Sequence, residues 1–279
     1  IDFTKALLGF YLYDNKQEDF YKCLSLDKEC KSSSKKVPKI IAIPTTSGTG
    51  SEVNSWGTLW NYEEKLSVKG KSLMPYLAIL DPSLSLTMPN SLTISTALDA
   101  LSHAFEAIWN KNFSYLTDEI SLLAISKIYK FLPLVLKNNN IENRHELQMA
   151  SLLAGISMSQ TKTAICHSIS YPLTAHYNIP HGIACALTLS EVAGLVDEND
   201  KKRLKVFKDA FNCYDIGISE NISTFLKSIG FSNLIRPFFS EKINENINFI
   251  NPSRAKNTVI DVTNELAIKI IKRSFNLYK

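Results

Sequence analysis

The spacing of the apolar residues changes at Pro89, and this change limits the folds open to the chain. Before Pro89, apolar residues form short continuous runs at 40–43 and 76–80, typical of strands buried in an α/β sheet. After it they recur at intervals of three and four, as on one face of a helix. Two such stripes are Leu98, Leu101, Phe105 and Ile108, and Val259, Val262, Leu266 and Ile270. The pattern predicts an α/β domain over residues 1–88 and an all-helical domain over residues 89–279.

The composition is that of a globular protein with a substantial core. Of the 279 residues, 45% are hydrophobic and 21% are charged, which excludes a disordered chain, a collagen and a coiled-coil array. The formal net charge is only +4, whereas a nucleic-acid-binding surface needs a concentrated basic patch. The densest basic stretches, residues 31–36 and 201–208, are interpreted as a solvated loop and the exposed face of a helix. No apolar run approaches the ~20 residues of a membrane span. We therefore expect neither a nucleic acid nor a membrane as partner.

The five cysteines show no CxxC spacing and no even framework, which indicates reduced thiols in a cytoplasmic protein. Cys166 precedes His167 directly, and such neighbours suggest a nucleophile and its base. Adjacent residues on a helix point about 100° apart, however, so the two side chains are poorly placed to pair. A cysteine in the core is the better interpretation of Cys166.

A loop of small polar residues follows the first apolar run. Residues 44–52 read PTTSGTGSE. Glycines let a backbone approach a ligand closely, and hydroxyls and free amides can then meet phosphate oxygens. The segment is neither a Walker A loop nor a GxGxxG motif. Taken alone, it is either a phosphate-contacting loop or an ordinary turn.

A carboxylate and several imidazoles form a candidate metal-binding set. Asp99 and His103 are four residues apart on the predicted helix, so both project from one face, beside the apolar stripe. Further along, His167, His176 and His181 lie within fifteen residues. Three imidazoles and a carboxylate suit Zn²⁺ or Fe²⁺. The alternatives are an ion pair on the helix surface for the first two residues and satisfied core or surface histidines for the others.

Several segments together resemble the iron-containing alcohol dehydrogenases. They occur in the family's order: residues 44–52 (PTTSGTGSE), 80–82 (LDP), 98–106 (LDALSHAFE), His167, 180–182 (PHG) and 251–252 (NP). The resemblance covers essentially the whole chain and implies a dehydroquinate-synthase-like architecture, with the active site between an α/β nucleotide-binding domain and a helical domain. The family's GGGS pyrophosphate loop is absent, and residues 1–2 resemble those just after it. The chain is thus expected to be N-terminally truncated, with only part of the first domain.

The resemblance also implies roles for individual residues. The residues that match the family's ligands for Fe²⁺ or Zn²⁺ are Asp99, His103, His167 and His181. Those that match contacts to NAD or NADP are Thr45, Thr46, Thr49, Ser51 and, in a more variable stretch, Lys65. Many members carry a proton-relay histidine four residues beyond the third ligand, where this chain has Tyr171. The relay is therefore expected to use Tyr171, His176 or water, or to be absent.

A closer resemblance is to the phosphonoacetaldehyde reductase branch, which makes 2-hydroxyethylphosphonate. It rests on residues 56–60, 108–112, 159–163 and 169–177. A phosphonate dianion needs a cation near the metal, and Lys162 is the candidate, although an exposed helix lysine fits this position equally. The implied chemistry is metal-assisted hydride transfer between a nicotinamide cofactor and a small aldehyde or primary alcohol, with phosphonoacetaldehyde as the expected substrate.

Three other functions remain open at this point. A general alcohol or aldehyde dehydrogenase of the same family would differ only in pocket residues. A metal-dependent lyase or cyclase could share the architecture, and it would consume no cofactor. A catalytically impaired fragment could bind metal or another chain, because the pyrophosphate loop is a main anchor for the cofactor. The family resemblance also implies a homodimer.

Overall fold

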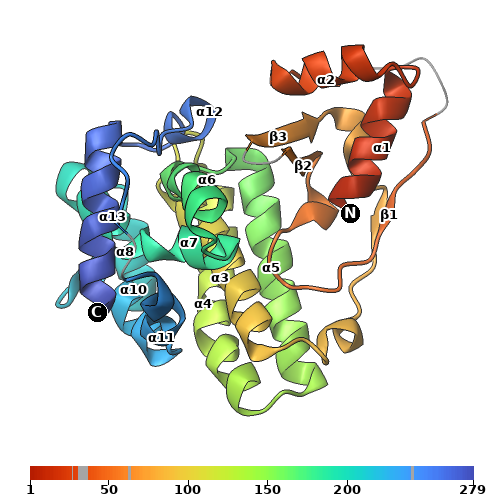
Figure 1. The fold of residues 1–279 in the computed structure, drawn as a ribbon. Helices are drawn as coiled ribbons and strands as arrows, with labels where there is room; N and C mark the ends of the chain where they lie inside the picture. The colour runs from red at the N-terminus through yellow and green to blue at the C-terminus, as the bar shows by residue number, and fades with distance from the viewer. Residues whose placement is uncertain (27, 31–36, 62–63, 240–241) are drawn as a thin grey trace.

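The computed structural model describes residues 1–26, 28–30, 37–61, 64–239 and 242–279. A small part with α-helices and strands is followed by a larger part whose described residues form helices and connecting loops, with no strand among them (Figure 1). This is the predicted fold class, a partial α/β part followed by an all-helical part. The basic stretch at 31–36 lies outside the described residues.

The α/β part begins with two helices, α1 (Asp2–Leu12) and α2 (Gln17–Ser25). Its strands are β1 (Ile41–Ala42), β2 (Trp56–Asn61), β3 (Glu64–Lys69) and β4 (Leu77–Ala78). β1 pairs with β4 in parallel, with Ile41 opposite Leu77, whereas β2 and β3 form an antiparallel hairpin. A small core that includes Leu8, Val68 and Leu73 joins α1 to this hairpin.

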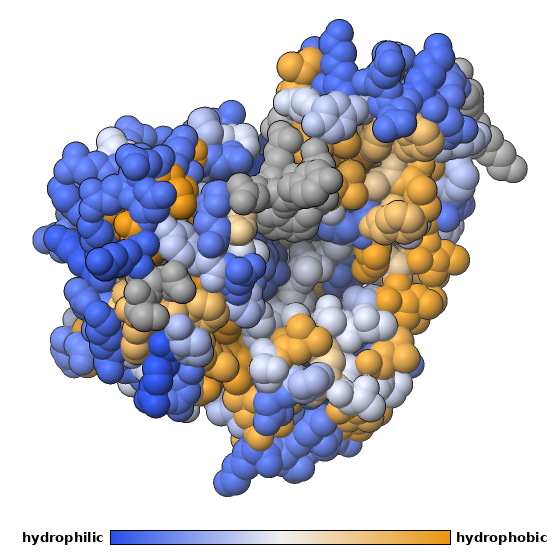
Figure 2. Space-filling model, in the orientation of Figure 1, coloured by the Kyte–Doolittle hydropathy of each residue, from blue (hydrophilic) through white to orange (hydrophobic). Residues whose placement is uncertain are grey.

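The two apolar runs at 40–43 and 76–80 are less buried than predicted. Each forms a strand of only two residues, and Ile41 and Leu77 are 58% and 46% exposed. Only one face of this two-stranded sheet is covered by the described residues, since Ala42 on β1 is buried while its neighbour Ile41 points to the uncovered face. Figure 2 shows apolar residues gathered on the right-hand side of the molecule, where β1 lies in Figure 1.

The helical part packs around α3. Its helices are α3 (Asn90–Ile108), α4 (Tyr115–Lys137), α5 (Ile141–Thr161), α6 (Ile165–Tyr177), α7 (His181–Leu187), α8 (Leu189–Asn199), α9 (Lys205–Phe211), α10 (Gly217–Ser228), α11 (Phe231–Ile235), α12 (Pro252–Ala255) and α13 (Asn264–Tyr278). The predicted stripe on α3 is confirmed: Leu98, Leu101, Phe105 and Ile108 have no exposed surface. The α4, α5 and α7 helices cover α3, so polar residues on its inner faces are withdrawn from water.

The second predicted stripe is only half helical. The Thr263 hydroxyl accepts a hydrogen bond from the Leu266 amide and caps α13, so the helix begins at Asn264. Val259 and Val262 precede the cap and pack against the core from a loop. The buried face of α13 is instead formed by Ala267, Ile270, Ile271, Ser274, Phe275 and Tyr278.

The basic stretch at 201–208 also differs from its prediction. Residues 201–204 form turns, and helix α9 begins only at Lys205. Arg203 is buried, and its guanidinium forms an ion pair with the Asp118 carboxylate. Charge alone predicts an exposed side chain here, but a buried arginine is tolerated when a carboxylate pairs with it.

The cysteines are placed as the sequence pattern predicts. All five are free and buried, and Cys166 lies in the helical core as predicted. Among the described helices, none combines the length and the apolar character needed to cross a membrane.

Candidate metal site and adjoining cavities

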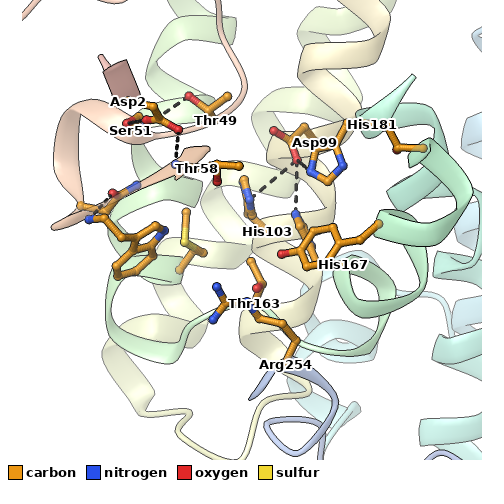
Figure 3. Close-up of a pocket in the computed structure, with 15 residues that line it drawn as sticks. Asp2, Thr49, Ser51, Thr58, Asp99, His103, Thr163, His167, His181 and Arg254 are labelled. Atoms are coloured by element: carbon orange, nitrogen blue, oxygen red, sulfur yellow. Dashed lines mark hydrogen bonds and ion pairs between the residues drawn. The ribbon is translucent and has the colours of Figure 1, made fainter. Parts of the chain in front are cut away.

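Three helices bring the four predicted metal ligands together (Figure 3). Asp99 and His103 come from α3, His167 from α6 and His181 from α7. The Asp99 Oδ1 atom lies 3.7 Å from His103 Nε2, 3.3 Å from His167 Nε2 and 3.8 Å from His181 Nε2. Asp99 and His103 are both only 5% exposed. The alternative of an ion pair on the helix surface is therefore wrong, and the carboxylate lies at the centre of an imidazole cluster.

The charge of Asp99 is stabilised by this cluster. Burial by itself raises the pKa of the Asp99 carboxyl, but the imidazoles of His103, His167 and His181 outweigh it and hold the pKa below its usual range. Asp99 is thus an anion at neutral pH, as a metal ligand must be.

Glu106 orients one of the imidazoles and was not predicted from the sequence. Its Oε2 atom accepts hydrogen bonds from His167 Nδ1 and the Ala164 amide, both at 2.7 Å, and Oε1 accepts one from the His167 amide at 3.1 Å. With Nδ1–H donated to Glu106, His167 turns Nε2 toward the Asp99 oxygen. This nitrogen and the Asp99 oxygen attract each other when a proton on Nε2, or a divalent cation in its place, lies between them. The donor set therefore fits a divalent ion.

We expect Glu106→Gln to weaken metal binding by about 10- to 100-fold, because an amide neither neutralises the imidazole nor fixes its tautomer. Competition with a chelating dye would measure the affinity for Zn²⁺. The matched control is Glu265→Gln, since the Glu265 side chain is 79% exposed and pairs with Lys269 on the same helix. Equal affinities for the wild type and Glu106→Gln would show that this carboxylate does not orient His167.

Cys185 is a further donor in the cluster. One donor atom each from Asp99, His167, His181 and Cys185 lie within 4.8 Å of one another. The Cys185 sulfur is 3.8 Å from His181 Nε2, and burial raises the pKa of its thiol. Its position four residues after His181 on α7 would have placed it on the ligand face in the sequence. Nitrogen, oxygen and sulfur donors of this kind suit Zn²⁺ or Fe²⁺.

Gly182 allows α7 to approach α3 closely enough to bring His181 to Asp99. A Cβ atom added to Gly182 would lie 1.8 Å from the Ser95 carbonyl oxygen and 3.1 Å from the Asp99 amide nitrogen. No other residue fits such a contact without moving one of the helices. The absence of a side chain at this position thus places His181, the fourth predicted ligand.

The loop at 44–52 borders the cluster with its second half. Thr49 and Ser51 line the same cavity as the metal-ligand cluster. Thr45 is exposed and Thr46 half-buried, and neither lines this cavity. The loop packs against α5 at Gly50, which has φ +58° and whose added Cβ would lie 2.5 Å from the Gly155 Cα. The side chain of Lys65 lies outside the described residues.

The start of the chain holds this loop in place. The Lys5 ammonium is buried and donates hydrogen bonds to the Ser51 carbonyl at 2.6 Å and to the Asn54 carbonyl and amide oxygens, both at 2.9 Å. Burial lowers the pKa of Lys5 to about 8, while the Asp2 and Glu52 carboxylates act in the opposite direction. Asp2 accepts hydrogen bonds from the Ser51 hydroxyl and from the Thr58 amide. Hydrogen bonds from Lys5 and to Asp2 therefore fix the second half of the loop to helix α1.

The shared cavity has a volume of about 260 Å³. Tyr171 lines it, with its ring stacked on that of His181 at a centroid distance of 5.9 Å. His176 is exposed in the last turn of α6 and does not line the cavity. Lys162 is also exposed and lines a neighbouring cavity of about 290 Å³. Arg254, which sequence reasoning missed, lines both cavities.

Two family models match the chain and together cover most of it. The model described as "Fe-containing alcohol dehydrogenase family, C-terminal" matches residues 93–234, and that described as "Iron-containing alcohol dehydrogenase" matches residues 1–82. Both agree with the resemblance drawn from the sequence motifs.

Two dehydrogenases illustrate the similarity of this chain to known proteins in sequence. The 1-propanol dehydrogenase of Citrobacter freundii is 38% identical over 155 residues, which are 54% of this chain and 42% of that protein. The NADPH-dependent butanol dehydrogenase of Clostridium saccharobutylicum is 34% identical over 194 residues, 69% of this chain and 49% of that protein. The chain thus spans less than half the length of these two relatives.

Among solved structures, the sulfoacetaldehyde reductase of Bifidobacterium kashiwanohense in complex with NAD⁺ superposes with a TM-score of 0.78 at 27% identity, over 92% of this chain and 69% of that one. The iron-containing alcohol dehydrogenase of Thermococcus thioreducens gives 0.79 at 25% identity, over 99% of this chain and 74% of that one. With a family model that matches more than half of its residues and neighbours that share its fold, the chain belongs to the iron-containing alcohol dehydrogenase family.

Proposed function

We propose that the chain acts in a metal-dependent NAD(P)H oxidoreductase that interconverts an aldehyde and a primary alcohol. The observation that carries this proposal is the cluster of Asp99, His103, His167 and His181, the first three buried, at the wall of a cavity that Thr49 and Ser51 also line. A metal site and a loop rich in hydroxyls and amides therefore face the same space. This arrangement would let the loop hold a cofactor close to a substrate carbonyl at the cluster, as hydride transfer requires.

The four ligand residues would hold Fe²⁺ or Zn²⁺. Such an ion supplies Lewis acidity toward a carbonyl oxygen, and the nicotinamide supplies the hydride. Glu106 keeps the His167 ring in one orientation, and Asp99, His103 and His167 are almost completely buried. We assign proton delivery to Tyr171, whose ring stacks on His181 in the cavity. His176 is the less suitable candidate, because it lies outside the cavity.

The cofactor would lie along the loop at 44–52. Thr49 and Ser51 are the loop hydroxyls that face the cavity, and roles for Thr45, Thr46 and Lys65 in binding NAD or NADP remain predictions. We also retain as proposals the domain boundary near residue 88, a homodimer and a cytoplasmic location.

For the substrate we propose phosphonoacetaldehyde, which the enzyme would reduce to 2-hydroxyethylphosphonate. Support comes from the branch-specific segments of the sequence and from the similarity to a sulfoacetaldehyde reductase, since a sulfonate and a phosphonate are both tetrahedral anions. A plain aliphatic aldehyde is the second candidate, because the butanol and 1-propanol dehydrogenases are the more similar in sequence.

Turnover of phosphonoacetaldehyde and of butanal with NADH and NADPH tests both candidates. We expect reduction of phosphonoacetaldehyde with a kcat/KM at least tenfold above that for butanal. A preference for butanal would identify a plain aliphatic aldehyde as the substrate. The proposed reaction, reduction of an aldehyde with NAD(P)H, would be unchanged. If neither aldehyde is reduced and the cofactor fluorescence shows no binding at millimolar concentration, the chain is a metal-binding polypeptide without dehydrogenase activity.

A further inference from the structure

The cavity at the metal-ligand cluster adjoins a second cavity that is strongly basic. Trp56, Thr163 and Arg254 line both. The second cavity, of about 290 Å³, has the further lining residues Ser67, Lys69, Lys162, Ser253, Lys256 and Asn257. Four of its lining side chains are cations, and among the described residues around it none is acidic. A concentration of positive charge in a concave site attracts anions.

Arg254 stands where the two cavities meet. It belongs to the short helix α12, whose start is capped by Asn251 through a hydrogen bond from the Ser253 amide at 3.0 Å. The Asn251 amide donates to the Ser168 hydroxyl at 2.6 Å, and Ser168 is the neighbour of His167 on α6. The segment that carries Arg254 is thus tied to the helix that carries a metal-ligand residue.

Hydrogen bonds also fix the C-terminal end of α12. The Asn257 side chain donates hydrogen bonds to the Thr163 carbonyl at 2.8 Å and to the Ser253 carbonyl at 3.3 Å. Figure 3 shows the Arg254 side chain reaching into the first cavity beside Thr163, on the side where His103 and His167 lie. Hydrogen bonds at both ends of α12 therefore fix the backbone that carries Arg254.

We propose that Arg254 binds the anionic group of the substrate, and that the substrate class is a short aldehyde or alcohol carrying a phosphonate or sulfonate. This inference rests on the proposed function. A carbonyl at the metal-ligand cluster and a tetrahedral anion at Arg254 occupy two ends of one cavity. The planar guanidinium can donate two parallel N–H bonds to two oxygens of such a group, which an ammonium cannot do.

Lys162, predicted to lie near the metal, lines the second cavity instead of the first. It lies in the second cavity with Lys69 and Lys256 and is absent from the lining of the first. There it adds to the positive potential behind Arg254 without facing the metal-ligand residues. Lys162 was the cation predicted near the metal, and we propose Arg254 in its place because Arg254 lines the first cavity.

Equilibrium binding to the Zn²⁺-loaded chain tests this inference without turnover. Isothermal titration would compare 2-hydroxyethylphosphonate, 2-hydroxyethanesulfonate and 1-propanol. We expect at least one of the anions to bind about tenfold or more tightly than 1-propanol, and the tighter of the two identifies the head group. Arg254→Gln should weaken its binding by about 10- to 100-fold and leave 1-propanol unchanged. Arg254→Lys should restore part of the loss.

The matched control is Arg273→Gln, which removes the same charge from an exposed position on α13 outside both cavities. Thermal melting of each variant checks that it is folded. Equal binding of 1-propanol and both anions by the wild type, or a larger loss in Lys162→Gln than in Arg254→Gln, would overturn the assignment of Arg254 and leave the oxidoreductase function intact. Failure of the wild-type chain to take up Zn²⁺ would be seen beforehand in its metal content and would overturn the proposed function itself.

Discussion

Replacing Asp99 with alanine is expected to reduce the metal affinity of the chain by more than about 100-fold. Loss of a residue that only orients a ligand typically costs 10- to 100-fold, and Asp99 is the central carboxylate of the cluster. Its Oδ1 atom faces three imidazole nitrogens at 3.3–3.8 Å. Without it, bringing a divalent ion among neutral imidazoles would leave the charge of the ion uncompensated in a buried site.

Metal content after dialysis, measured by mass spectrometry, and aldehyde reduction would both report the loss. Asp99→Asn is the more conservative variant, because it keeps the shape and removes the charge. Asp261→Asn serves as control, since the Asp261 side chain is 98% exposed. Stoichiometric metal in Asp99→Ala after dialysis would disprove the assignment of Asp99 as a ligand.

Replacing Gly182 with alanine should produce the second large effect, a loss of about 2–4 kcal/mol in the free energy of unfolding. Inserting one methyl group into a packed interior typically costs 1–3 kcal/mol, and more where the obstacle is rigid. Here the obstacle is backbone, since the new Cβ would lie 1.8 Å from the Ser95 carbonyl oxygen. Either α7 or α3 must move, and the movement separates His181 from Asp99.

Urea unfolding followed by circular dichroism gives the change in stability, and metal titration gives the effect on the site. Gly194→Ala is a matched control, because a Cβ at that position on α8 would meet the Ser219 Cβ at an ordinary 3.6 Å. In the control, alanine should stabilise the helix by about 0.5–1 kcal/mol. Equal urea midpoints for the two variants would mean that the α3–α7 contact is not tight.

Local patterns predicted the parts of the site that lie on one helix. Asp99 and His103 share a face because they are four residues apart, and Glu106 follows three residues later on that face. Glu106 was nevertheless missed, since a carboxylate in a helix is usually exposed. Its burial depends on α6, whose Ala164 and His167 amides it accepts hydrogen bonds from. Spacing gives the face of a helix but not the element that covers it.

The remaining features depend on contacts between segments far apart in the chain. Lys162 is close in sequence to His167, which favoured it as the anion-binding cation, yet it follows the end of α5 with φ +67° and lies outside the first cavity. Arg254 enters that cavity from α12, far from every ligand in sequence. The apolar runs that form β1 and β4 predicted strands correctly. Their exposure depends on which neighbours cover the sheet, and no periodicity encodes that.

The spread of the four predicted ligands over α3, α6 and α7 also has a consequence for folding. His167 and Asp99 are 68 residues apart in sequence, so no fragment with only one of these helices docked can form the cluster. Closing such long loops is entropically costly, and contacts of this kind tend to slow folding. During refolding, the ability to bind metal should therefore appear after most of the helical signal. It would report the final docking of the three helices, a step that circular dichroism alone does not resolve.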